Sequence, residues 1–207
     1  MGLVKRGRTQ LVADCVPVKE ADGAQLRVGL EDKDPETRRH SAREMRRFSD
    51  SVVALVSRLK REQDVAVREA ILTTLVRLDD ASAAVGMAEC LRSEDPALRN
   101  EVIEAIGLFS CDVSGTLRIL LNDPDPDVRI FAVNILDSRR QPDVESWLIE
   151  VIERDKHLNV CATAVDLLCE AGTEAAVDPL LRLMLRFEGN AFIQFAANRA
   201  LKRIRGV

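Results

Sequence analysis

The side chains best suited to metal binding or nucleophilic catalysis are five cysteines and two histidines, at Cys15, His40, Cys90, Cys111, His157, Cys161 and Cys169. No two cysteines form a C-x-x-C pair, and neither histidine has ligand spacing to a cysteine pair, so the pattern predicts no metal site. The odd number of cysteines without pairing favours reduced thiols that pack as small apolar residues in a cytosolic protein.

The chain also lacks the side-chain groupings that carry out hydrolytic or transfer chemistry. No Cys-His pair, Ser-His-Asp set or carboxylate pair stands out. Cys161 and Cys169 lie eight residues apart, roughly two helical turns, so they could share one helix face, although packing explains both more simply. These observations predict a protein that is not an enzyme and that carries no cofactor.

A pairing of aspartate with arginine recurs along the chain instead. Aspartate stands four residues before arginine at Asp34 and Arg38, Asp64 and Arg68, Asp95 and Arg99, and Asp125 and Arg129. In the last of these, Asp125 can cap the free N–H groups of a helix start, and Pro126 suits the first turn. Apolar residues then share one helical face, at Val128, Ala132, Ile135 and Leu136.

The same helix pattern occurs six times, as ETRRHSAREM, AVREAILTTL, ALRNEVIEAI, DVRIFAVNIL, NVCATAVDLL and FIQFAANRAL. The position of Arg129 is held in the last two copies by Cys161 and Gln194. Successive spacings are 30, 31, 30, 32 and 33 residues, and a period this regular indicates a solenoid. Because one helix cannot fill such a repeat, each repeat is expected to hold a second, more N-terminal helix.

These signals predict a repeat array over residues 23–207, preceded by an N-terminal arm or cap at residues 1–22. The second helices of the repeats are expected near 35–48, 64–78, 95–109, 126–139, 156–171 and 190–205. Gly107 lies near the end of the third, where it either weakens the helix or permits the close approach of a neighbour or a ligand.

With these motifs the chain resembles the HEAT-repeat family, and more closely the short bacterial HEAT-like repeats of the phycobilisome-lyase type. The resemblance implies an all-α fold, a right-handed α-solenoid of about six HEAT-like helical hairpins. It also implies that the recurring aspartates and arginines form a structural ladder between neighbouring repeats, and that the second helices line the concave surface. HEAT arrays host many functions, so the resemblance specifies the fold and not the partner.

Given that geometry, the helical period predicts which side chains face the concave groove. If Val128, Ala132 and Ile135 are buried, the opposite face of that helix carries Ile130, Asn134 and Asp137. The equivalent positions in other repeats are Arg39, Arg43, Arg46, Glu69, Thr73, Asn100, Glu104, Asp166, Phe195, Arg199 and Lys202. The same transfer places four more residues toward the groove, namely Val76, Gly107, Ala162 and Cys169.

Charge is segregated along the array. Residues 1–78 carry a net charge of +4, residues 79–180 carry −13, and residues 181–207 carry +5. The groove is therefore expected to be basic at each end and acidic in the middle, a pattern that can steer a complementary partner within a Debye length of about 8 Å. The acidic middle would repel a phosphate backbone, and aromatic residues make up only 3% of the chain, too few for a base-stacking platform.

These features favour a non-catalytic protein–protein interaction scaffold or regulatory adaptor that binds a protein partner through its concave groove. The basic ends favour one alternative, a nucleic-acid-binding HEAT-like protein, and the resemblance adds another, a phycobilin-lyase-like enzyme. No apolar run approaches the roughly 18–20 residues that span a membrane. The basic N-terminus has no adjoining long apolar segment, so no signal peptide is expected. We therefore predict a cytoplasmic, bacterial-type protein with no membrane association.

Overall fold

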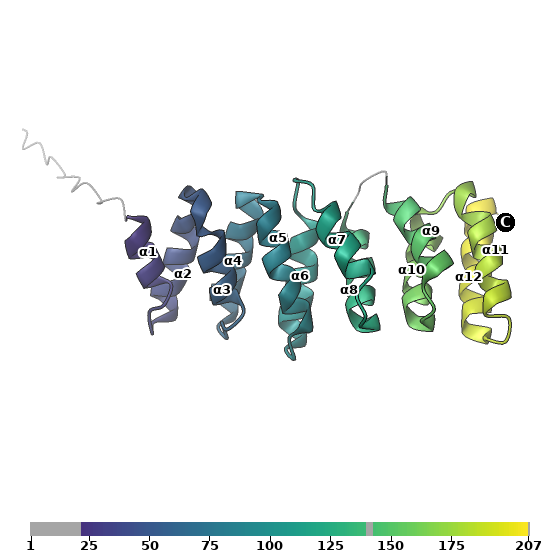
Figure 1. Ribbon diagram of the computed structural model, residues 1–207, viewed down its shortest axis with the longest axis horizontal. Coiled ribbons are helices and arrows are strands. Elements are labelled where there is room, and N and C mark those ends of the chain that lie inside the picture. Colours follow the sequence, from purple (N-terminus) through teal and green to yellow (C-terminus); the bar gives the residue numbers. More distant parts are fainter. Residues whose placement is uncertain (1–21, 140–142, 207) are drawn as a thin grey trace, which may run out of the picture.

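The computed structural model describes residues 22–139 and 143–206, and this part of the chain contains twelve α-helices and no strand. The helices follow one another in pairs along the long axis of the molecule (Figure 1). The first helices of the pairs are α1 (Gly23–Gly29), α3 (Val52–Leu59), α5 (Ala81–Ala88), α7 (Ser114–Leu121), α9 (Val144–Arg154) and α11 (Val177–Arg186). The second helices are α2 (Pro35–Glu44), α4 (Val65–Leu78), α6 (Pro96–Gly107), α8 (Pro126–Ser138), α10 (Leu158–Ala171) and α12 (Ala191–Arg205).

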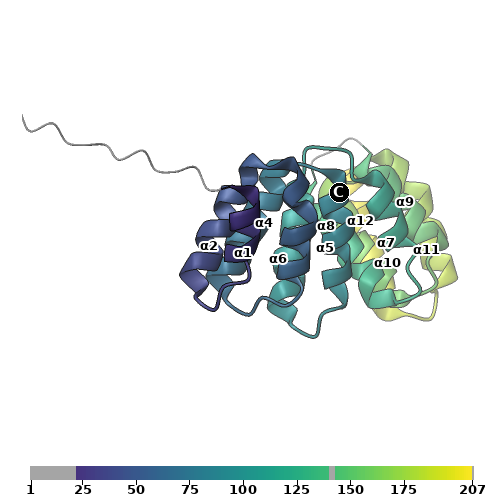
Figure 2. The same cartoon turned by 60° about the vertical axis from the view of Figure 1, so that its left-hand side comes forward.

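The paired helices form two layers, which the turned view in Figure 2 separates. Each second helix packs against its own first helix and against the neighbouring second helices. Contacts between successive second helices are, along the array as a whole, more extensive than contacts between successive first helices. The predicted all-α solenoid is confirmed over the described residues. The exposed side of the array that the six second helices form is the second-helix surface.

Aspartate caps begin four of the six second helices. The carboxylate of Asp64 accepts a hydrogen bond from the backbone N–H of Val67 at 3.1 Å, and that of Asp125 accepts one from Asp127 at 2.9 Å. Asp34 and Asp95 cap α2 and α6 in the same way. These bonds satisfy N–H groups that have no partner within the helix, so the recurring aspartate fixes where each second helix starts.

The second helix expected over 35–48 ends earlier, at Glu44, and continues only as a short 3-10 turn over Met45–Arg47. The Ser51 hydroxyl donates hydrogen bonds to the carbonyls of Met45 at 3.1 Å and Phe48 at 2.6 Å. These carbonyls therefore find a partner without a continuing helix. The predicted arm or cap at residues 1–22 lies outside the described residues, except that Asp22 is the residue before α1.

One continuous apolar core runs between the two layers. The face predicted for α8 is in it, with Val128 and Leu136 2% exposed and Ala132 and Ile135 fully buried. Within the described chain, no helix has both the length and the apolar character needed to cross a membrane.

Three of the residues expected in the groove are instead buried between helices, namely Gly107, Ala162 and Cys169. A Cβ atom built on Gly107 would lie 2.4 Å from the Cβ of Ser138 in α8. Gly107 therefore permits the close approach of a neighbouring helix and not of a ligand. The prediction failed at these positions because the helical period specifies the side of a helix but not how closely a neighbouring helix approaches it.

Candidate protein-interaction surface

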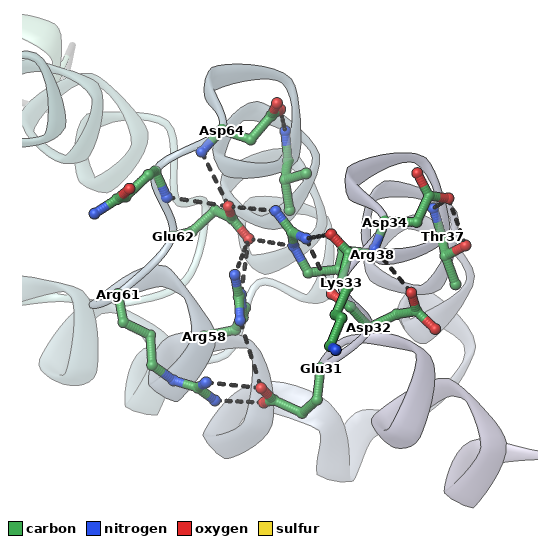
Figure 3. A network of polar contacts seen from close by, with 12 residues as sticks. Glu31, Asp32, Lys33, Asp34, Thr37, Arg38, Arg58, Arg61, Glu62 and Asp64 are labelled. Carbon is green, nitrogen blue, oxygen red and sulfur yellow. Dashed lines mark hydrogen bonds and ion pairs between the residues drawn. The ribbon is translucent and has the colours of Figure 1, made fainter.

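The turns within the repeats are joined by a ladder of charged contacts, whose first rung is shown in Figure 3. Glu62, only 5% exposed, accepts hydrogen bonds from Arg38 at 2.8 Å and 2.9 Å and from Arg58 at 2.7 Å. Its Oε1 also accepts the backbone N–H groups of Gln63 and Asp64. Burial acts to raise the pKa of Glu62, but the hydrogen bonds from Arg38 and Arg58 outweigh it and lower the pKa to about 2.

The ladder uses partly different acids from those expected. Arg68 pairs with Asp95 of the next repeat, as the resemblance implied. Arg38 pairs with Glu62, and Arg129 pairs with Asp155 at 2.7 Å, so neither arginine contacts the residue at the cap position of the next repeat. Glu62 and Asp155 each lie two residues before that position. In the fifth repeat the cap position is held by His157, which has no carboxylate. In the second repeat Glu62 receives the arginine, while Asp64 accepts the backbone N–H of Val67.

The arginines also bind their own turns. Arg129 donates to the carbonyl of Asp123 at 2.8 Å, six residues earlier, and Arg38 donates to that of Asp32 at 3.0 Å. Arg99 donates to the carbonyl of Ser93 at 2.5 Å, and its guanidinium lies 5.6 Å from the ring centroid of Phe131. No acid is paired with Arg99 among the described residues.

Different donors serve the turns where the ladder arginine is missing. In the fifth repeat, Arg186 of the following repeat donates to the carbonyl of Ile152 at 2.7 Å and to that of Asp155 at 2.8 Å. In the sixth repeat, the amide of Gln194 donates to the carbonyls of Met184 at 2.7 Å and Phe187 at 3.2 Å. Both turns therefore keep a side-chain donor.

The cysteines considered for chemistry lie in the core. Cys161 and Cys169 are 0% and 9% exposed, and Cys161 donates its thiol to the carbonyl of Asp155 at 3.3 Å. Burial raises the pKa of Cys161 to about 11 despite the nearby Arg186, so its thiol is protonated at neutral pH and is a poor nucleophile. Cys90 and Cys111 are free thiols, and Cys15 lies outside the described residues.

Apart from the three buried residues and the half-buried Val76, the other fourteen residues predicted to face the groove lie on or directly after second helices and reach the surface. Three of them are half-buried, namely Arg39, Ile130 and Asn134. The other eleven are exposed, namely Arg43, Arg46, Glu69, Thr73, Asn100, Glu104, Asp137, Asp166, Phe195, Arg199 and Lys202. The second-helix surface thus displays the predicted set together.

Two of the predicted basic residues do not present free charge. Arg199 pairs with Asp166 at 2.8 Å, which joins the basic C-terminal end of the surface to its acidic middle. Arg39 pairs with Glu36 one helical turn earlier at 2.5 Å. By contrast, Glu69 and Glu104 have no ion-pair partner in the described chain. Asp137 on α8 also has no ion-pair partner among the described residues, so the available negative charge of the predicted set lies on α4, α6 and α8.

A groove of about 460 Å³ opens between α4 and α6 on this surface. These two second helices contact each other less closely than any other neighbouring pair of second helices. The apolar part of the groove is formed by Val65, Leu72, Val76, Ala105 and Leu108. Three acids also line it, namely Glu69, Glu101 and Glu104, with Arg77 as one basic residue among them. The helical period located Glu69, Thr73 and Glu104, but it could not show that α4 and α6 separate.

The stacked helical pairs, the ladder between their turns and the open second-helix surface define a helical-repeat protein of the α-solenoid class. The family model for HEAT repeats matches residues 24–107 and 113–202, and the chain belongs to this family.

Two of the similar proteins have names connected with phycocyanin. The uncharacterized phycocyanin operon protein Z of Pseudanabaena tenuis (strain PCC 7409) is 23% identical over 167 residues, which cover 76% of this chain and 82% of that protein. The complex of CpcE and CpcF of phycocyanin lyase from Nostoc sp. PCC7120 gives a TM-score of 0.38 at 14% identity, covering 99% of each chain. The archaeal HEAT-like repeats protein from Thermococcus onnurineus NA1 gives 0.48 at 15% identity, covering 89% of this chain and 87% of that one.

Proposed function

We propose that this chain is a non-catalytic scaffold or regulatory adaptor that binds a protein partner through its second-helix surface. The observation that carries the proposal is the α4/α6 groove, where an apolar floor and unpaired carboxylates meet on the surface formed by the six second helices. Solenoids present such extended surfaces to their partners. An exposed apolar floor rimmed by charge is typical of a protein interface.

Two observations favour a protein partner over nucleic acid. The carboxylates of Glu69, Glu101 and Glu104 gather at the centre of the surface, where they repel a phosphate backbone. The Arg199–Asp166 ion pair also reduces the positive charge at the C-terminal end. A continuous basic track, which counterion-release binding requires, does not cross this region.

The proposal is tested by immobilising the full chain and recovering partners from lysate of its source at low and at moderate salt, with nuclease-treated lysate in parallel. A discrete protein retained after nuclease treatment is the expected result. A matched variant, Glu69→Lys with Glu104→Lys, reverses two exposed charges and is expected to lose most of that protein while it keeps the wild-type circular dichroism. Complete loss of bound material on nuclease treatment would overturn the proposal in favour of nucleic acid.

The name of the Pseudanabaena relative supplies one defined protein to include in this test. That relative is named for a phycocyanin operon, so purified phycocyanin is a suitable first candidate in a direct binding assay. Incubation of the chain with apo-phycocyanin and free bilin, followed by denaturing electrophoresis and zinc-enhanced fluorescence, also tests the lyase alternative. We expect no covalent attachment beyond the uncatalysed background.

A further inference from the structure

The α4/α6 groove is large enough to hold several side chains of a partner. Its volume of about 460 Å³ lies within the range of roughly 300–1,000 Å³ typical of ligand pockets. Leu72 and Ala105 form its floor at 7% and 5% exposure, whereas Leu108 stands 66% exposed at the end of α6 and Val65 61% exposed at the start of α4. Two large exposed apolar side chains thus border a depression whose floor is formed by buried apolar side chains.

The charge around this depression is negative and incompletely compensated. Glu69 and Glu104 face it from α4 and α6 without an ion-pair partner in the described chain. Glu101 lies 3.2 Å from the Nε of Arg68, but its buried Oε2 receives no hydrogen bond. Oε2 of Glu101 therefore faces the guanidinium of Arg68 inside the repeat, and Glu69 and Glu104 supply the negative charge that a partner can reach.

The geometry points to a partner segment that places two or three apolar side chains in the α4/α6 groove and Lys or Arg side chains beside Glu69, Glu101 and Glu104. We infer a short amphipathic helix, because leucines at helical spacing can fill a groove between two helices while flanking basic residues remain at its rim. This inference rests on the proposed scaffold function and adds the chemistry of the partner. Anionic lipid or nucleic acid is disfavoured because the same carboxylates would repel its phosphates.

The test uses a displayed library of random peptides of about 16 residues, the length of a helix of roughly four turns. The library is selected on the full-length wild-type chain, with removal of peptides that also bind the Leu108→Glu variant. The control variant is Ile119→Glu, which places the same charge at a position 70% exposed on α7, outside the groove. Circular dichroism and melting of both variants verify that neither change alters the fold.

We expect the selected pool to be rich in Leu, Ile or Phe and to carry net positive charge. Its leading peptide, synthesised with a fluorescent label, is expected to bind at least tenfold more weakly to Leu108→Glu than to Ile119→Glu. Glu104→Lys is expected to weaken binding of this peptide as well. The same variant is expected to bind more tightly a version of the peptide with Glu in place of each basic residue. That reversal identifies charge recognition and separates it from a general loss of stability.

Failure to enrich peptides that depend on Leu108, or enrichment of acidic ones, would overturn the inference. Enrichment of sequences matching residues 3–12, LVKRGRTQLV, would also overturn it, because the occupant would then be the chain's own N-terminal stretch. The scaffold function is judged separately. A partner recovered from lysate equally by wild type and Leu108→Glu would leave that function standing and exclude this groove.

Discussion

Replacing Glu62 by glutamine tests whether the buried first rung of the ladder stabilises the array. The change keeps the shape of the side chain but removes the negative charge that faces Arg38, whose side chain is 9% exposed, and Arg58, whose side chain is 14% exposed. Removal of one partner of a buried ion pair costs roughly 3–5 kcal/mol. The depressed pKa of Glu62 provides an independent estimate of the same quantity.

The sign of the pH effect follows from the lowered pKa. The ordinary pKa of 4.5 falls to about 2 in the folded state, so ionised Glu62 stabilises the fold by about 3 kcal/mol. This contribution is fully present above pH 4.5 and is lost as the pH falls from there through 2. At pH 3 less than half of it remains. The stability difference between wild type and Glu62→Gln should therefore shrink by more than half between pH 7 and pH 3.

The assay is urea unfolding followed by circular dichroism at both pH values, with amide hydrogen exchange to locate the loss in α2 and α3. Glu89→Gln is the matched control, since it removes the acid of the exposed Lys60–Glu89 pair, whose side chains are 38% and 68% exposed. That change should cost less than about 1 kcal/mol. A cost below about 1 kcal/mol for Glu62→Gln at pH 7, or one that stays constant down to pH 3, would refute the reasoning.

Three further substitutions, two of them with a control substitution, test the packing and the turns. Ala132→Asp places an unpaired charge at a fully buried site and should cost about 4 kcal/mol or more, seen as loss of ellipticity and rapid proteolysis. Gly107→Ala forces a Cβ against α8 and should lower the free energy of unfolding in urea by about 1–3 kcal/mol. A Cβ added at Gly115 would meet no neighbouring group within 4 Å, so Gly115→Ala should raise the free energy of unfolding by up to about 1 kcal/mol. Arg186→Gln removes donors from three carbonyls, so amide exchange in residues 152–157 should accelerate. Arg182→Gln, which removes only an exposed ion pair, should leave that exchange unchanged.

The architecture could be predicted from the sequence because its signals are local and repeated. The spacing of the recurring arginines gave the period. Asp125 caps the helix that it was predicted to start, and Asp34, Asp64 and Asp95 cap the equivalent helices. The apolar spacing on α8 identified the buried face, since a helix fixes which side chains share a side. Caps and helix faces depend only on residues close together in the chain, so the sequence alone is enough to predict them.

The candidate groove required information that no single helix contains. The period placed Glu69 and Glu104 at the surface, yet it also placed Gly107 and Cys169 there, because it does not specify how closely the next helix approaches. The groove forms where α4 and α6 contact each other less extensively than the other neighbouring second helices do. The same limit applies to charge, since the pairing of Arg199 with Asp166 joins residues 33 positions apart.

The last two repeats lack the recurring arginine, yet the carbonyls of their turns still receive a side-chain hydrogen bond. The repeat therefore requires a donor at this turn and not a particular residue type. Arg129 satisfies the carbonyl six residues before it, and in the next repeat the carbonyl of Asp155 occupies that place relative to Cys161. Cys161 is only a weak donor to it, and Arg186 reaches back from α11 to bind the same oxygen. An unpaired buried backbone carbonyl is costly wherever it occurs. The turn can therefore lose its arginine where another donor reaches its carbonyls, either from the next repeat, as with Arg186, or from the same position, as with Gln194.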